Sequence, residues 1–188
     1  MACAPVETRH DCAHRKATGA IYWRANPRTK SCFRAASQHS LPRVSCDHGA
    51  VPIKYRKFAP GDVDAAHRLS LAVGWPHRRE DWQFVLGIGS GYVAVEGGRV
   101  VGTILYWKHD ARHASLGMVI VDPASQGRGI GRELMSLALR DLEGRCVQLN
   151  ATPAGKPLYE RLGFKAIGRV QQHQGLAHAG TVAAPARG

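Results

Sequence analysis

The alternation of apolar and polar residues becomes regular only from Val51 onward. Residues 53–58 alternate with a period of two, which is typical of a half-buried strand. A helix is predicted next, with Asp62 as its N-cap and with Gly74 and Pro76 at its end. Its apolar side chains recur at helical spacing on one face: Val63, Ala66, Leu69 and Val73.

The remainder of the chain is predicted to combine short strands with helices. The dipeptide Gly97-Gly98 between two β-rich runs predicts a hairpin, because both positions of a type I′ turn require positive φ. We expect helices at 79–86, 129–142 and 156–162, and strands at 92–96, 99–107, 116–121, 147–151 and 164–170.

The order of these elements, β-α-α-β-β-β-α-β-α-β, predicts the fold class. Consecutive strands joined by short turns pair antiparallel, whereas the later β-α-β crossover requires parallel pairing. We therefore predict an α/β (α+β) domain over residues 52–175, with a mixed, mostly antiparallel sheet and helices on both faces. Residues 1–51, which lack periodicity, are predicted to be a disordered basic extension, and residues 176–188 a flexible tail.

Composition adds a strong positive charge to this domain. The 188 residues carry a net charge of +12, which suits an anionic partner such as nucleic acid or a phosphate-rich cofactor. No RNA- or DNA-binding motif accompanies the charge, so nucleic acid is the less favoured partner. The chain has neither an apolar run long enough to span a membrane nor the start of a signal peptide, so we expect a cytoplasmic protein without a membrane partner.

The five cysteines do not suggest a metal site. Cys12 and His14 form one Cys-x-His pair, and Cys46 and His48 form another. Zinc fingers normally place paired ligands two to four residues apart at both ends, and that pattern is absent here. We therefore expect no metal, and an odd number of cysteines favours reduced thiols.

A glycine-rich segment joins the predicted strand at 116–121 to the predicted helix at 129–142. Gly127, Gly129 and Gly131 permit a sharp turn and a close approach to the backbone, where the helix N-terminus leaves N–H groups unsatisfied. Arg128 and Arg132 add full positive charges to the helix dipole. The segment therefore predicts an anion site suited to a pyrophosphate.

Two familiar phosphate loops do not fit this segment. A P-loop would end in Gly-Lys-Ser/Thr, and a dinucleotide-binding loop would read Gly-x-Gly-x-x-Gly. The spacing here is Gly-x-Gly-x-Gly over residues 127–131.

The full string Val-x-Val-x-Pro-x-x-Gln-Gly-x-Gly-Ile-Gly, over residues 119–131, resembles the acetyl-CoA-binding motif of the GNAT superfamily of N-acetyltransferases. Its position after the fourth strand and before the third helix of the domain is that of the family. A second GNAT signature, Leu-Tyr-Glu-Arg-Leu-Gly-Phe, occupies residues 158–164. The resemblance covers about residues 53–174, and the tract from 74 to 175 is similar to the first domain of bacterial two-domain GNAT proteins.

The resemblance implies that acetyl-CoA is the co-substrate and implies a role for each matching residue. The backbones of Val119 and Val121 would pair with the pantetheine amides, because the fourth and fifth strands of GNAT domains splay apart. Asn150 would hydrogen-bond the pantetheine arm. The pyrophosphate would be bound by Gln126, Gly127, Arg128, Gly129, Ile130, Gly131 and Arg132.

Tyr159 is the predicted catalytic residue, since GNAT domains often place a tyrosine there that protonates the departing thiolate. A phenol is a suitable proton donor to a thiolate. A base must also remove a proton from the amine, but residues 115–118 contain no carboxylate where some families place that base. Asp110, His109, His113 and ordered water remain the candidates.

The resemblance implies a small-molecule or peptide amine as acceptor, bound between the first helices and the late strands. Several aromatic side chains could line that pocket: Trp75, His77, Trp82, Tyr106 and Trp107. Among these, Trp82 is expected to lie in the core instead. We predict direct transfer of acetyl to a primary amine in a ternary complex. The alternatives are a non-catalytic CoA-binding module and a nucleic-acid-binding protein that uses the basic arm, and a homodimer remains open.

Overall fold

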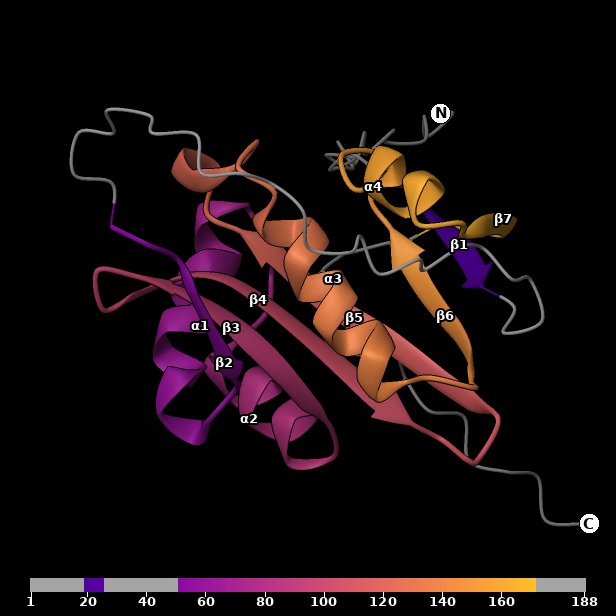
Figure 1. Ribbon diagram of the computed structural model, residues 1–188, viewed down its shortest axis with the longest axis horizontal. Coiled ribbons are helices and arrows are strands. Elements are labelled where there is room, and N and C mark those ends of the chain that lie inside the picture. The colour runs from indigo at the N-terminus through magenta and orange to yellow at the C-terminus, as the bar shows by residue number, and fades with distance from the viewer. Residues whose placement is uncertain (1–18, 26–50, 172–188) are drawn as a thin grey trace, which may run out of the picture.

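The computed structural model describes residues 19–25 and 51–171, and the remaining parts of the predicted extension and tail lie outside the described residues. The elements run in the order β1 (Gly19–Ala25), β2 (Lys54–Lys57), η1 (Pro60–Asp62), α1 (Val63–Ala72), α2 (Arg79–Gly87), β3 (Ser90–Glu96), β4 (Arg99–Lys108), β5 (His113–Val121), η2 (Pro123–Ser125), α3 (Ile130–Asp141), β6 (Cys146–Ala151), α4 (Lys156–Arg161) and β7 (Lys165–Gln171). Figure 1 shows their arrangement. From β2 onward the predicted order of strands and helices is confirmed.

The described strands form one sheet in the order β2-β3-β4-β5-β6-β1-β7. Strands β2 to β5 pair antiparallel as a meander, and β5 pairs parallel with β6. The Gly97-Gly98 turn closes the β3–β4 hairpin with φ of 55° and 80°. The predicted mixed, mostly antiparallel sheet is therefore confirmed.

Strand β1 contradicts the prediction of disorder for part of residues 1–51. Residues 19–25 lie between β6 and β7 and pair antiparallel with both strands. The run Ile21-Tyr22-Trp23 is rich in β-branched and aromatic residues, which favour strands. Its partners lie more than 120 residues later in the chain, so local periodicity could not reveal the pairing.

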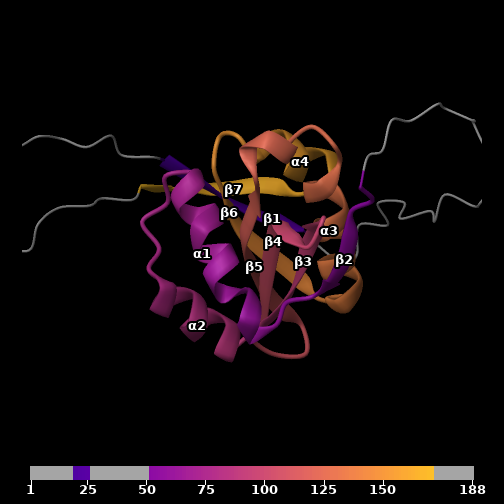
Figure 2. The same ribbon diagram turned by 90° about the vertical axis from the view of Figure 1, so that its left-hand side faces the viewer.

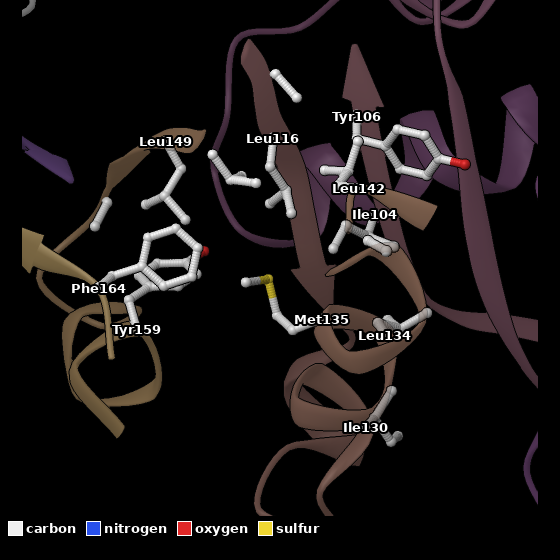
Figure 3. Close-up of a cluster of buried hydrophobic side chains, with 14 of the residues drawn as sticks. Ile104, Tyr106, Leu116, Ile130, Leu134, Met135, Leu142, Leu149, Tyr159 and Phe164 are labelled. Carbon is white, nitrogen blue, oxygen red and sulfur yellow. The ribbon is translucent and has the colours of Figure 1, made fainter. Parts of the chain in front are cut away.

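Helices cover both faces of the sheet, as Figure 2 shows from the side. Helices α1 and α2 pack on one face around Trp82, which is fully buried, as predicted. Helix α3 packs on the other face through Ile130, Leu134 and Met135. Figure 3 shows Met135 facing the side chains that come from β6 and α4. The face below α1 and α2 and the face below α3 are therefore separate apolar layers.

The start of α1 differs from the prediction in one detail. Asp62 occupies the N-cap position, but its carboxylate makes no capping bond to the helix. It accepts hydrogen bonds from both terminal nitrogens of Arg56, at 2.6 and 2.7 Å, and from the backbone N–H of Ala59 at 2.9 Å. These bonds, led by the one from Arg56, hold the pKa of Asp62 below its usual range despite burial.

A polar cluster connects the end of α3 to the first strands of the sheet. The Oδ2 atom of Asp141 accepts hydrogen bonds from Lys57 Nζ at 2.5 Å, Tyr106 Oη at 2.5 Å and Tyr92 Oη at 2.8 Å. Burial alone would raise the pKa of Asp141, but the bonds from Lys57, Tyr106 and Tyr92 outweigh it and lower the pKa to about 2. The ionised form of Asp141 therefore stabilises the folded state.

We expect Asp141→Asn to lower the melting temperature at pH 7 by about 4–8 °C, since hydrogen bonds to a charged group contribute more than neutral ones. A lowered folded-state pKa stabilises the fold above the unfolded value near 4, and this stabilisation is lost as pH falls toward about 2. Urea unfolding between pH 7 and pH 3 should show the difference between the two proteins shrinking. A constant difference would assign the effect to packing.

Candidate active site

Strands β5 and β6 pair over only part of their length. Their parallel register runs from His113 opposite Cys146 to Leu116 opposite Leu149 and then ends. Beyond Leu116, residues 117–121 of β5 have no partner on β6, although β5 continues to pair with β4. The two strands therefore form an open wedge, with backbone groups of β5 along one side.

A β-bulge lies at the point where the wedge opens. Gly117 pairs with Leu105 and Ile120 with Thr103, so one residue of β4 faces two residues of β5. Met118 sits in the bulge with φ of 53°, a left-handed conformation that is rare for a residue with a side chain. Its carbonyl accepts a hydrogen bond from Thr103 Oγ1 at 2.9 Å. The strained bulge is therefore held from β4, and strain of this kind often marks functional sites.

The glycine-rich segment forms the mouth of the wedge. Gly127 and Gly129 have φ of 78° and 79°, and Gly129 is the N-cap of α3. A Cβ atom at either position would meet nothing within 4 Å, so these glycines are required for their backbone conformation rather than for space. The first N–H groups of an α-helix have no partner within the helix, and such groups can bind an anion.

Arg128 does not point into the wedge. Its guanidinium donates two hydrogen bonds to the carboxylate of Glu96, at 2.6 and 3.0 Å, and this contact raises the pKa of Arg128. The side chain is absent from the lining of the cleft that the other residues of the segment form. The charge of Arg128 is therefore paired with Glu96 at the end of β3 rather than directed into the cleft.

The wedge is part of a cleft of about 1750 Å³ that joins the two faces of the sheet. Apart from Arg128, every residue expected to hold the cofactor lines it: Val119, Val121, Gln126, Gly127, Gly129, Ile130, Gly131, Arg132 and Asn150. The Gln126 side-chain amide donates to the carbonyl of Val121 at 3.2 Å, so the segment is tied to the end of β5. Tyr159 lines the same cleft.

Tyr159 is buried beside the cleft and packs against a second aromatic ring. Its ring packs edge to face against Phe164, with centroids 6.0 Å apart, and only 6% of the residue is exposed (Figure 3). A Cβ atom on Gly155 would lie 2.8 Å from Cε2 of this ring, so a glycine is required there. Burial raises the pKa of Tyr159 to about 12, which keeps the phenol protonated at neutral pH.

The aromatic residues considered for the acceptor pocket separate into two groups. Trp75, His77 and Trp107 line the cleft on the side of α1 and α2. Trp82 is instead buried and donates its indole N–H to Ser70 Oγ at 2.9 Å. Tyr106 lies on the opposite face of the sheet, in the layer below α3, so it does not contribute to the pocket.

The three titratable residues near the β4–β5 turn differ in their connection to the cleft. His109 Nε2 is 2.7 Å from Ser115 Oγ, and Ser115 lines the cleft. Asp110 pairs with His113 at 2.9 Å, and neither residue lines the cleft. The hydrogen bonds from the His113 ring and the Arg112 backbone lower the pKa of Asp110 to about 2, which makes it a poor base.

The sequence did not single out Ser115 as a functional residue. The signal available was its position on β5 opposite Trp107, which places both side chains on the face below α1 and α2. The contact with His109 depends on the register of the hairpin, which no local pattern gives.

Other classes of site can be tested within the described residues. No group of three or more His, Cys, Asp and Glu side chains is placed there to hold a metal ion. Both Cys-x-His pairs lie outside the described residues. Among the helices that are described, none is long and apolar enough to cross a membrane.

The sequence matches the family described as an acetyltransferase (GNAT) domain over residues 80–180, more than half of the chain. It is 34% identical over 117 residues to the uncharacterized N-acetyltransferase YitH of Bacillus subtilis (strain 168). The match covers 59% of this chain and 40% of that protein, so the chain spans well under half the length of this curated relative.

Solved structures share the fold. A GNAT-family acetyltransferase from Streptococcus pneumoniae TIGR4 is 29% identical, with a TM-score of 0.55, and the match covers 61% of this chain and 88% of that one. The ribosomal-protein-S18-alanine N-acetyltransferase of Escherichia coli is 21% identical, with a TM-score of 0.55 over 60% of this chain and 77% of that one.

Proposed function

The chain belongs to the GNAT acetyltransferase family, and from this premise we propose that it transfers an acetyl group from acetyl-CoA to a primary amine in a ternary complex. The observation that carries the proposal is the cleft itself, because one continuous space joins the open edge of β5, the N-terminus of α3 and Tyr159. Membership of the family supports N-acetyl transfer in general. The identity of the co-substrate, acetyl-CoA, and of the acceptor, a primary amine, is what we propose beyond that.

The residues of the cleft fit acetyl-CoA. The N–H groups of residues 126–131 and the charge of Arg132 suit the pyrophosphate, which a helix N-terminus attracts. Val119 on the unpaired edge of β5 and Asn150 across the wedge suit the amides of the pantetheine arm. Arg128 contributes its backbone N–H, while Glu96 holds its side chain.

The chemistry assigns one task to each group around the wedge. The neutral amine attacks the thioester carbonyl, the new C–N bond forms and the C–S bond breaks. An N–H of the bulge at Met118 polarises the carbonyl oxygen. Tyr159 gives its proton to the departing thiolate. The proton of the amine leaves through Ser115 to His109.

His109 is the favoured base among the three candidates because Ser115 connects it to the cleft. An imidazole is well suited to accept a proton near neutral pH. Asp110 lacks the basicity, and its partner His113 lacks access to the cleft. The hydroxyl of Ser115 can donate to the imidazole while it accepts from the amine.

The proposal is tested with purified protein, acetyl-CoA and a panel of amines, by following thiol release and identifying the acetylated product by mass spectrometry. We expect saturable CoA binding and amine-dependent thiol release. Tight CoA binding with no acetylation of any amine would contradict the proposal and favour a non-catalytic CoA-binding module.

We expect Ser115→Ala and His109→Gln each to lower kcat by about tenfold to a hundredfold, in line with the loss of general base catalysis. His113→Gln is the matched control, since its ring contacts Asp110 outside the cleft, and an equal loss in this variant would refute the assignment.

A further inference from the structure

The described part of the cleft lining contains no carboxylate. Its charged members are Arg132, in the first turn of α3, and Arg161, at the end of α4. Enzymes that bind polycations normally need negative charge close to the additional ammonium groups, because burying an unpaired charge is costly. The lining described here provides no such partner, and the positive net charge of the chain opposes a polycation further.

The end of the cleft below α1 and α2 is aromatic. The indole N–H of Trp107 donates to the carbonyl of Val85 at 2.8 Å, which fixes the orientation of the ring. A Cβ atom on Gly117 would lie 3.3 Å from Cζ3 of this ring, so the glycine leaves the indole room to lie close to β5. Trp75 and His77 line the same end, with ring centroids 5.4 Å apart and planes at 60°.

His77 has an unsatisfied buried atom in this region. Among the described residues, its Nδ1 is the side-chain nitrogen or oxygen that is buried without a hydrogen-bond partner. Burial lowers the pKa of His77, although Asp81 opposes the shift, so the ring favours the neutral form. The neutral ring of His77 therefore adds no positive charge to the aromatic end of the cleft.

We propose that the acceptor is an aromatic monoamine: a primary amine attached by a short chain to a flat apolar ring, with no further positive charge. The ring would lie against Trp75 and Trp107. Polyamines, amino sugars with several ammonium groups and lysine-rich peptides would be excluded. This inference names the substrate class of the site and rests on the proposed function.

The experiment compares 2-phenylethylamine, hexylamine and spermidine as acceptors for the full chain with acetyl-CoA. We expect kcat/KM for 2-phenylethylamine to exceed both others by at least about tenfold, which corresponds to 1.4 kcal/mol. Trp107→Leu and, in case that variant does not fold, Trp75→Leu should reduce this preference to less than about threefold. Phe84→Leu is the matched control, because this exposed aromatic on α2 lies outside the cleft lining.

A second variant adds the negative charge that the described lining lacks. Gln148→Glu places a carboxylate in the cleft with little change in shape, and it should raise the ratio of spermidine to 2-phenylethylamine turnover by about tenfold. A wild-type protein that prefers spermidine, or a Trp107→Leu variant that keeps the full aromatic preference, would overturn the inference.

Binding without turnover separates this inference from the proposed function. Saturation-transfer NMR on the CoA-bound protein reports which amine occupies the cleft, whether or not acetyl is transferred. Preferential binding of 2-phenylethylamine without acetylation would support the aromatic site and contradict the proposed reaction. Preferential binding of spermidine would contradict the aromatic site even if acetylation occurred.

Discussion

Tyr159→Phe is expected to lower kcat by two to three orders of magnitude, about the effect of losing a general acid. CoA affinity should stay within about twofold, because phenylalanine keeps the ring that packs against Phe164 and the variant loses only the hydroxyl. Steady-state kinetics by thiol release would give kcat, and isothermal titration calorimetry would give the Kd of CoA. This combination separates a lost proton donor from a damaged binding site.

The pH dependence sharpens this prediction. Because the pKa of Tyr159 is raised to about 12, the phenol stays protonated below that value, and kcat of the wild-type protein should not decline between pH 8 and pH 10 through this residue. Tyr92→Phe is the matched control, since that hydroxyl bonds Asp141 away from the cleft. A Tyr159→Phe variant with normal turnover across this pH range would rule out the general-acid role.

The order and type of the elements from residue 52 onward could be predicted because each element carries its own periodicity. The amphipathic repeat of α3 and the Gly97-Gly98 turn are local signals. Strand β1 could not be predicted in the same way, since its place between β6 and β7 depends on partners far along the chain. The capping bond expected from Asp62 was also wrong, because its carboxylate binds Arg56 instead of the start of the helix.

The candidate site shows a similar division. Gln126 and Gly129 lie in the turn before α3 and line the cleft, and this turn was predictable since backbone conformation at the start of a helix follows from nearby residues. The orientation of Arg128 depends on Glu96, which is 32 residues away and in a different element. The contact between His109 and Ser115 depends on hairpin register. Sequence therefore predicts which residues form the turn at the start of α3, but not which side-chain charges lie free beside it.

Gly127 and Gly129 provide the strongest test of the proposed pyrophosphate site. Both lie in the left-handed region, which costs a residue with a side chain about 1–2 kcal/mol. We expect the double variant Gly127→Ala/Gly129→Ala to weaken CoA binding by about tenfold to a hundredfold, measured as Kd by calorimetry. The alanines either strain the loop or rotate its N–H groups away from the anion.

The matched control is Gly87→Ala near the end of α2. A Cβ atom there also meets nothing within 4 Å, but the residue is helical and its φ is not positive, so CoA affinity should not change. Because the new methyl groups at 127 and 129 would meet no protein atom within 4 Å, a loss of affinity in the double variant would come from the backbone conformation or from contact with the bound CoA, and not from a clash within the protein. Unchanged affinity in the double variant would mean that the helix N-terminus does not bind the pyrophosphate. The site would then depend on Arg132 and the edge of β5.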